Sequence, residues 1–182
     1  MPAPEPIPAE TTLKRILRVS RFNGLSVVII ASLGGFISLL LGDLVGILVC
    51  VLAVVAGSME LRGNKKLRQR NAEGMAWLVR GESLLLAVIL VYCATRLGSF
   101  DAETAMGNLT PDMEAPLKEL GLERADILSM VRTTFFATYV SVSLVTLIYQ
   151  GGMILYYRRR IALVNEALAA QPPAPPSRQP GN

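Results

Sequence analysis

The sequence contains no histidine and only two cysteines, Cys50 and Cys93, each within an apolar run. No group of residues therefore has the ligand spacing of a zinc, haem or iron–sulfur site. P-loop, G-x-S-x-G, H-E-x-x-H and C-x-x-C patterns are also missing. These absences predict no catalytic residues, no cofactor and no metal site, apart from weak Ca²⁺ or Mg²⁺ binding by carboxylates. The cysteines are interpreted as two free, buried thiols, with a disulfide between them as the alternative.

Charge is also scarce along much of the chain. Asp43 is the only charged residue between Gly24 and Met59. Hydrophobic residues make up 52% of the 182 residues and the mean hydropathy is +0.44, whereas the charged residues occur in clusters. This pattern is typical of an integral membrane protein rather than a soluble domain. The first 20 residues lack an apolar h-region and a small-residue cleavage site, so we expect no removable signal peptide.

The stretch from Gly24 to Met59 is too long for one membrane-spanning helix. Its 36 residues would form a helix of roughly 54 Å, whereas the hydrocarbon core of a bilayer is about 30 Å thick. Gly42 and Asp43 are turn formers, and they divide the stretch into predicted spans at 24–41 and 44–59. Asp43 is therefore interpreted as the outer turn of a tight hairpin. The alternative, a carboxylate used in transport, requires an acid deeper in the bilayer.

Small residues recur on one face of each predicted helix of this hairpin. Both sets follow the spacing i, i+4, i+7, i+11, which places their members on a single helix face. Such faces let membrane helices pack closely, so we expect the two sets to meet. Reflection about position 44 pairs Gly42 with Gly46, Ser38 with Cys50, Gly35 with Ala53 and Ala31 with Gly57.

Two more apolar segments complete the expected fold, which is all-α: an integral membrane four-helix bundle whose first two helices form the tight hairpin. The chain ends are rich in proline and are predicted to be disordered tails. The expected segments are a tail at 1–10, an amphipathic interfacial helix at 11–22, and a transmembrane domain at 23–160 with its third and fourth spans at 76–97 and 133–157. They continue with an outer loop at 98–130 containing short helices, a helix end at 161–170 and a tail at 171–182.

Lysine and arginine residues gather on one side of the predicted bundle. Of the 18, four precede the first span, six lie between the second span and the apolar part of the third, and four follow the fourth. The outer loop carries seven acids and only two bases, Lys118 and Arg124. The positive-inside rule then predicts that both termini of the multi-pass protein are cytoplasmic. The inner (plasma) membrane is the expected location from the size and style of the chain. Because the basic residues flank apolar spans, the net charge of +4 does not predict a nucleic-acid partner.

Glu82 is a candidate polar site because it lies inside the predicted third span. Its expected partner is Lys65, Arg68 or the arginine run 158–160, in an interfacial ion pair that fixes helix packing; the alternative is a functional carboxylate. A second candidate is a polar stripe on the fourth span, which serves either interhelical hydrogen bonding or a solute path. The stripe consists of Tyr139, Ser143, Thr146 and Gln150.

The sequence has no motif specific enough to assign a family. The absence of catalytic motifs and the short loops predict a non-enzymatic membrane protein, with an accessory or assembly subunit of a larger complex as the first interpretation. The alternative is a small oligomeric transporter or channel that uses Glu82 and the polar stripe. Expected partners are the lipid bilayer and other membrane subunits or further copies of the chain.

Overall fold

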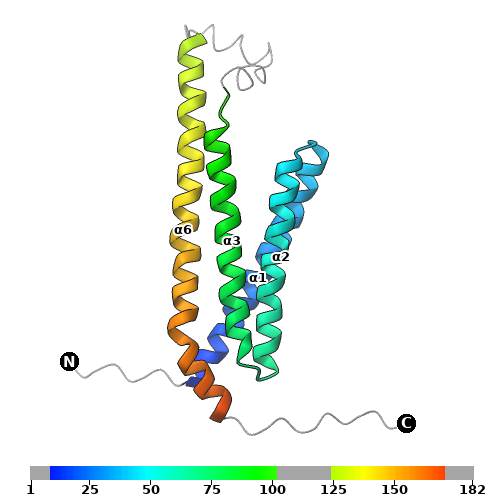
Figure 1. Ribbon diagram of the computed structural model, residues 1–182, viewed down its shortest axis with the longest axis vertical. Coiled ribbons are helices and arrows are strands. Elements are labelled where there is room, and N and C mark those ends of the chain that lie inside the picture. The colour runs from blue at the N-terminus through cyan, green and yellow to red at the C-terminus, as the bar shows by residue number, and fades with distance from the viewer. Residues whose placement is uncertain (1–8, 102–123, 171–182) are drawn as a thin grey trace, which may run out of the picture. The chain divides into compact units, whose positions relative to one another are not determined.

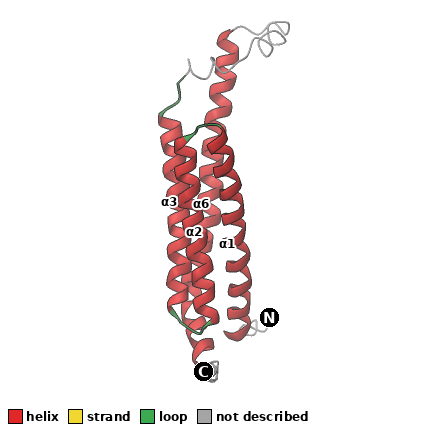
Figure 2. Cartoon of the chain, turned by 90° about the vertical axis from the view of Figure 1, so that its right-hand side faces the viewer, coloured by secondary structure: helices red, strands yellow, loops and turns green. Residues whose placement is uncertain are grey.

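The computed structural model describes residues 9–101 and 124–170. These residues form four helices and no strand (Figures 1 and 2). The helices are α1 (Ala9–Leu40), α2 (Leu44–Arg68), α3 (Glu73–Gly98) and α6 (Arg124–Ala170). Each is long and apolar enough to cross a membrane, so the predicted all-α class with four candidate membrane-spanning helices is confirmed for the described residues.

The chain divides into two compact units. Unit 1 comprises residues 1–84 and 153–182, and therefore contains α1, α2, the first part of α3 and the last part of α6. Unit 2 comprises residues 85–152, with the rest of α3 and α6. Aromatic rings connect the two helices of unit 2: the ring centroids of Tyr92 and Tyr139 are 6.1 Å apart, and those of Phe100 and Phe135 are 5.0 Å apart.

The turn between α1 and α2 lies where Gly42 and Asp43 predict it. Gly42 has a φ of +69°, in the left-handed region that glycine adopts without a Cβ penalty. The backbone N–H of Asp43 donates to the carbonyl oxygen of Ser38 at 2.9 Å, and Asp43 precedes the first residue of α2. Asp43 is thus a turn residue, as expected.

The contact between α1 and α2 differs from the predicted pairing by about one helical turn. A Cβ built on Gly46 would lie 2.5 Å from Ser38 Oγ, and one built on Gly35 would lie 3.2 Å from Cys50 Cβ. Ser38 therefore faces Gly46 rather than Cys50, and Gly35 faces Cys50 rather than Ala53. The reason is that the chain reverses about Gly42, midway between the helix ends at Leu40 and Leu44, and not about position 44.

Two other members of the predicted small-residue faces also have different surroundings. Gly57 lies against Gly24 instead of Ala31, because a Cβ built on it would be 3.0 Å from the Gly24 carbonyl oxygen. A Cβ built on Gly42 would meet no atom within 4 Å beyond its two chain neighbours. Gly42 therefore serves the turn and not helix packing. Ala31, Gly46 and Ala53 are buried, which agrees with their place on the faces that meet.

Helix α1 is continuous across the predicted boundary between an interfacial helix and the first span. It begins at Ala9, so the last two residues of the predicted tail are helical. Leu13 and Ile16 are 5% and 0% exposed, and they belong to the core of unit 1 rather than resting on lipid. Helices α2, α3 and α6 supply the apolar partners of this face, which the local sequence pattern cannot reveal. The other members of this core are Leu67, Met75, Leu78, Tyr157, Val164 and Ala167.

Helix α6 has 47 residues and extends beyond the predicted span 133–157 at both ends, including the predicted helix end at 161–170. The short helices predicted for the outer loop fall within residues 102–123, outside the described part of the chain. The rest of the N-terminal tail and the tail at 171–182 also lie outside it. Both cysteines are free; Cys93 is buried as predicted, whereas Cys50 is only half-buried because it lies in the α1–α2 hairpin near its partly exposed surface.

Candidate functional site

Four polar side chains meet inside unit 1, and each comes from a different helix. They are Asn23 of α1, Glu60 of α2, Glu82 of α3 and Tyr157 of α6, with exposed fractions of 7%, 3%, 1% and 0%. Buried polar groups are costly unless they are hydrogen-bonded, and intramembrane acids are rare and usually functional. We call these four residues the acid cluster.

Asn23 joins the two carboxyl groups of the acid cluster. Its Nδ2 atom donates to Glu60 Oε2 at 3.0 Å and to Glu82 Oε1 at 2.8 Å. Tyr157 donates its phenolic hydroxyl to Glu60 Oε1 at 3.0 Å, so both oxygens of Glu60 have donors. The two carboxyl groups also lie within hydrogen-bonding reach of each other. Glu82 Oε2 is buried and has no hydrogen-bond partner among the described residues.

The partner of Glu82 is not the predicted cation. Within residues 9–101 and 124–170, neither Glu60 nor Glu82 forms an ion pair, whereas Lys14 pairs with Glu10 and Lys66 with Glu73, both near the surface. Lys65 and Arg68 are exposed, as are Arg158 and Arg159 of the arginine run. Long cationic side chains extend their charge toward water or headgroups, whereas a short asparagine reaches Glu82 inside the bundle.

Glycines next to the acid cluster allow the helices to approach closely enough for these short contacts. A Cβ built on Gly24, beside Asn23, would lie 3.1 Å from the Gly57 carbonyl oxygen. A Cβ built on Gly81, beside Glu82, would lie 3.0 Å from the Ala56 carbonyl oxygen and 3.3 Å from the Glu60 amide nitrogen. Small residues at both helix contacts thus bring α1 and α3 against α2, with the carboxyl groups between them.

A second polar group lies one helical turn away and is fully hydrogen-bonded. Asn64 Nδ2 donates to the Leu17 carbonyl oxygen at 2.6 Å and to Ser20 Oγ at 2.7 Å. Asn64 Oδ1 accepts from Arg68 Nε at 3.0 Å. The amide of Asn64 therefore uses both of its hydrogens and its oxygen, which suits a structural link between α1 and α2. In contrast, the acid cluster has a buried oxygen without a donor and two acids without a cation.

The predicted polar stripe belongs to unit 2, whereas Glu82 belongs to unit 1. Tyr139, Ser143 and Thr146 are half-buried and Gln150 is buried, so this face of α6 is less exposed than the apolar residues beside it. Ser143 Oγ donates to the carbonyl oxygen of Tyr139 in the same helix at 2.8 Å. Gln150 Oε1 is buried and has no partner among the described residues.

The sequence-based interpretation missed three members of the acid cluster, namely Asn23, Glu60 and Tyr157. A shared signal was present: each is polar and lies at the end of an apolar span, with Asn23 before Gly24, Glu60 after Met59 and Tyr157 before Arg158. In helices that alternate in direction, these ends meet at the same level. Glu82 lies a few residues further into the membrane-spanning part of the third span than these three residues do in theirs.

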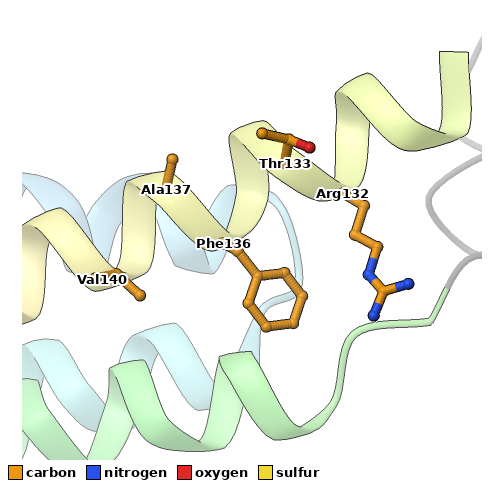
Figure 3. A pocket seen from close by; sticks show the side chains of 5 residues that line it. All are labelled: Arg132, Thr133, Phe136, Ala137 and Val140. Atoms are coloured by element: carbon orange, nitrogen blue, oxygen red, sulfur yellow. The ribbon is translucent and has the colours of Figure 1, made fainter. Parts of the chain in front are cut away.

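One surface depression is lined by residues of unit 2. It has a volume of about 460 Å³ and is lined by residues of α6 alone, from Arg132 to Val140 (Figure 3). Arg132 lies 5.8 Å from the centroid of the Phe136 ring. Among the described residues, no carboxyl, thiol or imidazole group lines it. Elsewhere too, the described residues contain no group of three or more histidine, cysteine, aspartate or glutamate residues that would hold a metal ion.

No family model, curated protein or solved structure matches the chain. Functional inference therefore depends on the chemistry of the acid cluster itself. Two carboxyl groups held together without a cation repel each other when both are ionised, and a shared proton removes that repulsion. The arrangement is suited to binding and releasing a proton.

Proposed function

We propose that the protein is a small, non-enzymatic membrane transporter that works as an oligomer, with proton binding at Glu60 and Glu82 as its central chemical event. The observation that carries the proposal is the buried pair of carboxyl groups that shares Asn23 and has no ion-pair partner in the described structure. A purely structural link would be served better by an amide whose polar atoms all have hydrogen-bond partners, as in Asn64. Four helices rarely enclose a path alone, so further copies of the chain are required.

The proposed mechanism uses the hydrogen-bond donors around the pair. With one proton bound, the carboxyl that holds it donates to the other, while Asn23 donates to Glu60 Oε2 and Glu82 Oε1 and Tyr157 donates to Glu60 Oε1. Loss of that proton leaves two negative charges that only three neutral hydrogen atoms stabilise. The resulting repulsion acts between α2 and α3, which approach each other closely at Gly81 because this residue has no side chain. Proton release would thus loosen one defined helix contact, which is the coupling that a transport cycle needs.

The proposed setting is the inner (plasma) membrane with both termini cytoplasmic. The distribution of lysine and arginine supports this orientation, because only four of the 18 lie outside the three flanking groups. The acid cluster then lies near the cytoplasmic boundary of the spans, where protons from the cytoplasm have a short route to it.

Proton flux into liposomes containing the purified full-length protein tests this function. A pH-sensitive dye is trapped inside, and a potassium diffusion potential drives proton entry. We expect flux above that of empty liposomes, with a loss of at least tenfold for Glu82→Gln and Glu60→Gln. Glu73→Gln is the matched control, because Glu73 is an exposed acid of α3 paired with Lys66. Equal flux for all variants that remain assembled would reject the proposal.

An accessory or assembly subunit is the second candidate function. The observation that favours it is α6: the most apolar 18-residue window of this helix has no buried residue. Such a helix offers its surface to other membrane proteins as well as to lipid. Purification from the native host in mild detergent, followed by mass spectrometry, distinguishes the two candidates. Stoichiometric foreign subunits would favour an accessory role, and a defined homo-oligomer would favour transport.

A further inference from the structure

A groove on the surface of unit 1 combines positive charge with apolar side chains in a definite order. It has a volume of about 610 Å³ and lies between α1 and the end of α2. Its cationic residues are Lys14, Arg18 and Arg21 of α1 and Arg68 of α2. Its apolar residues are Leu17, Phe22 and Leu25, of which Phe22 is 76% exposed and Leu25 47% exposed. None of its lining residues in the described part of the chain is acidic.

The order of these residues along α1 matches the two parts of a phospholipid. The cations occupy the N-terminal part of the groove, and Phe22 and Leu25 lie toward the uncharged segment that begins at Gly24. From Lys14 to Leu25 the helix rises by roughly 16 Å. A headgroup phosphate beside the arginines would therefore leave its acyl chains beside the apolar end.

Arg68 is held toward this groove by a buried partner. Its Nε atom donates to Asn64 Oδ1 at 3.0 Å, and Asn64 is itself fixed to α1 through Leu17 and Ser20. Asn64 is 4% exposed. The guanidinium of Arg68 is thus oriented before any ligand arrives, which lowers the entropy lost on binding and suits the planar recognition of phosphate. Within the described chain, Arg18, Arg21 and Arg68 form no ion pair, whereas Lys14 is paired with Glu10.

We propose that this groove binds one anionic phospholipid, with its phosphate at Arg18, Arg21 and Arg68 and an acyl chain along Phe22 and Leu25. The charge complementarity identifies the headgroup as anionic, and the exposed apolar residues identify the ligand as a lipid rather than a free anion. The inference is independent of the proposed transport function, because it uses none of the residues of the acid cluster.

Native mass spectrometry of the full-length protein with added phosphatidylglycerol tests the proposal, with phosphatidylcholine of the same acyl chains for comparison. We expect one tightly bound phosphatidylglycerol and at least tenfold weaker retention of phosphatidylcholine. The triple variant Arg18→Gln, Arg21→Gln and Arg68→Gln should lose affinity for phosphatidylglycerol by on the order of 100-fold, since each basic residue near a membrane surface contributes about fivefold.

The matched control removes the same charge from outside the groove: Arg15→Gln, Arg158→Gln and Arg159→Gln, all exposed residues of the same unit. It should change the affinity less than threefold. An equal loss in both triple variants would overturn the proposal, because general charge attraction would then explain binding. Displacement of the lipid by an equal concentration of glycerol phosphate would also overturn it, because the apolar residues would then contribute nothing. Circular dichroism of each variant confirms that the helices are intact.

Discussion

The phenolic hydroxyl of Tyr157 donates a hydrogen bond of 3.0 Å to Glu60, a residue 97 positions earlier in the chain. Tyr157 is completely buried, and it also belongs to the apolar core of unit 1. Its ring therefore packs against the apolar residues of the core while its hydroxyl reaches the acid cluster. This contact ties the last part of α6 to α2 and provides the first prediction.

Replacement of Tyr157 by phenylalanine should lower stability. The ring and its packing remain, but Glu60 Oε1 loses a donor while it stays buried, which costs about 1–3 kcal/mol. Tyr156→Phe is a close control, because the Tyr156 hydroxyl is buried without a hydrogen-bond partner in the described residues, and removal of its hydroxyl should be neutral or stabilising. Thermal unfolding in a mild detergent measures both. Equal melting temperatures for the two variants would contradict the structure at Tyr157.

Glu82→Gln should stabilise the protein, and more so at pH 8 than at pH 5. Glutamine keeps the shape and the hydrogen-bonding capacity of the protonated acid, but it removes one of two acids that lack a cation. As the pH rises the wild-type pair loses its shared proton and gains repulsion, whereas the variant does not. The difference between their melting temperatures should therefore grow with pH. A constant difference between pH 5 and pH 8 would argue against proton sharing.

The membrane class and the hairpin were predictable from the sequence because both depend on local features. The uncharged run from Gly24 to Met59 determines the apolar spans, and Gly42 with Asp43 determines the turn. The acid cluster was not predictable in the same way. Glu60 and Tyr157 each resemble a polar residue at the end of a span, and only the packing of four helices brings them together. Proximity to the membrane boundary also made a cationic partner for Glu82 the expected choice.

Close approach of α2 and α3 depends on glycine, so Gly74→Ala should be strongly destabilising. A Cβ there would lie 2.6 Å from the Gly63 carbonyl oxygen and 2.9 Å from the Leu67 amide nitrogen, and neither backbone atom can move alone. The helices would have to separate near the core around Leu67, with an expected cost of about 1–3 kcal/mol for overpacking. Gly151→Ala is the control: its Cβ would meet nothing within 4 Å, and alanine favours a helix by about 1 kcal/mol. Opposite shifts in melting temperature are expected; a shift of the same sign for both would contradict the close contact.

Disulfide trapping measures the register of the α1–α2 hairpin. A Cβ at position 35 would lie 3.2 Å from Cys50 Cβ, near the separation of about 3.5–4.5 Å that a disulfide requires. Gly35→Cys should therefore cross-link to the native Cys50 under mild oxidation, in a background with Cys93→Ala. Ser38→Cys should not, because Ser38 faces Gly46 about one turn nearer the hairpin tip.

The opposite result, in which Ser38→Cys cross-links and Gly35→Cys does not, would support reflection about position 44 and reject a turn about Gly42. The outcome also bears on the acid cluster, because the same register sets Gly24 against Gly57. A shift of one turn would carry Asn23 by about 5.4 Å along α2, beyond hydrogen-bonding reach of Glu60. Cross-linking of the hairpin far from the acids therefore tests whether Asn23 can join them.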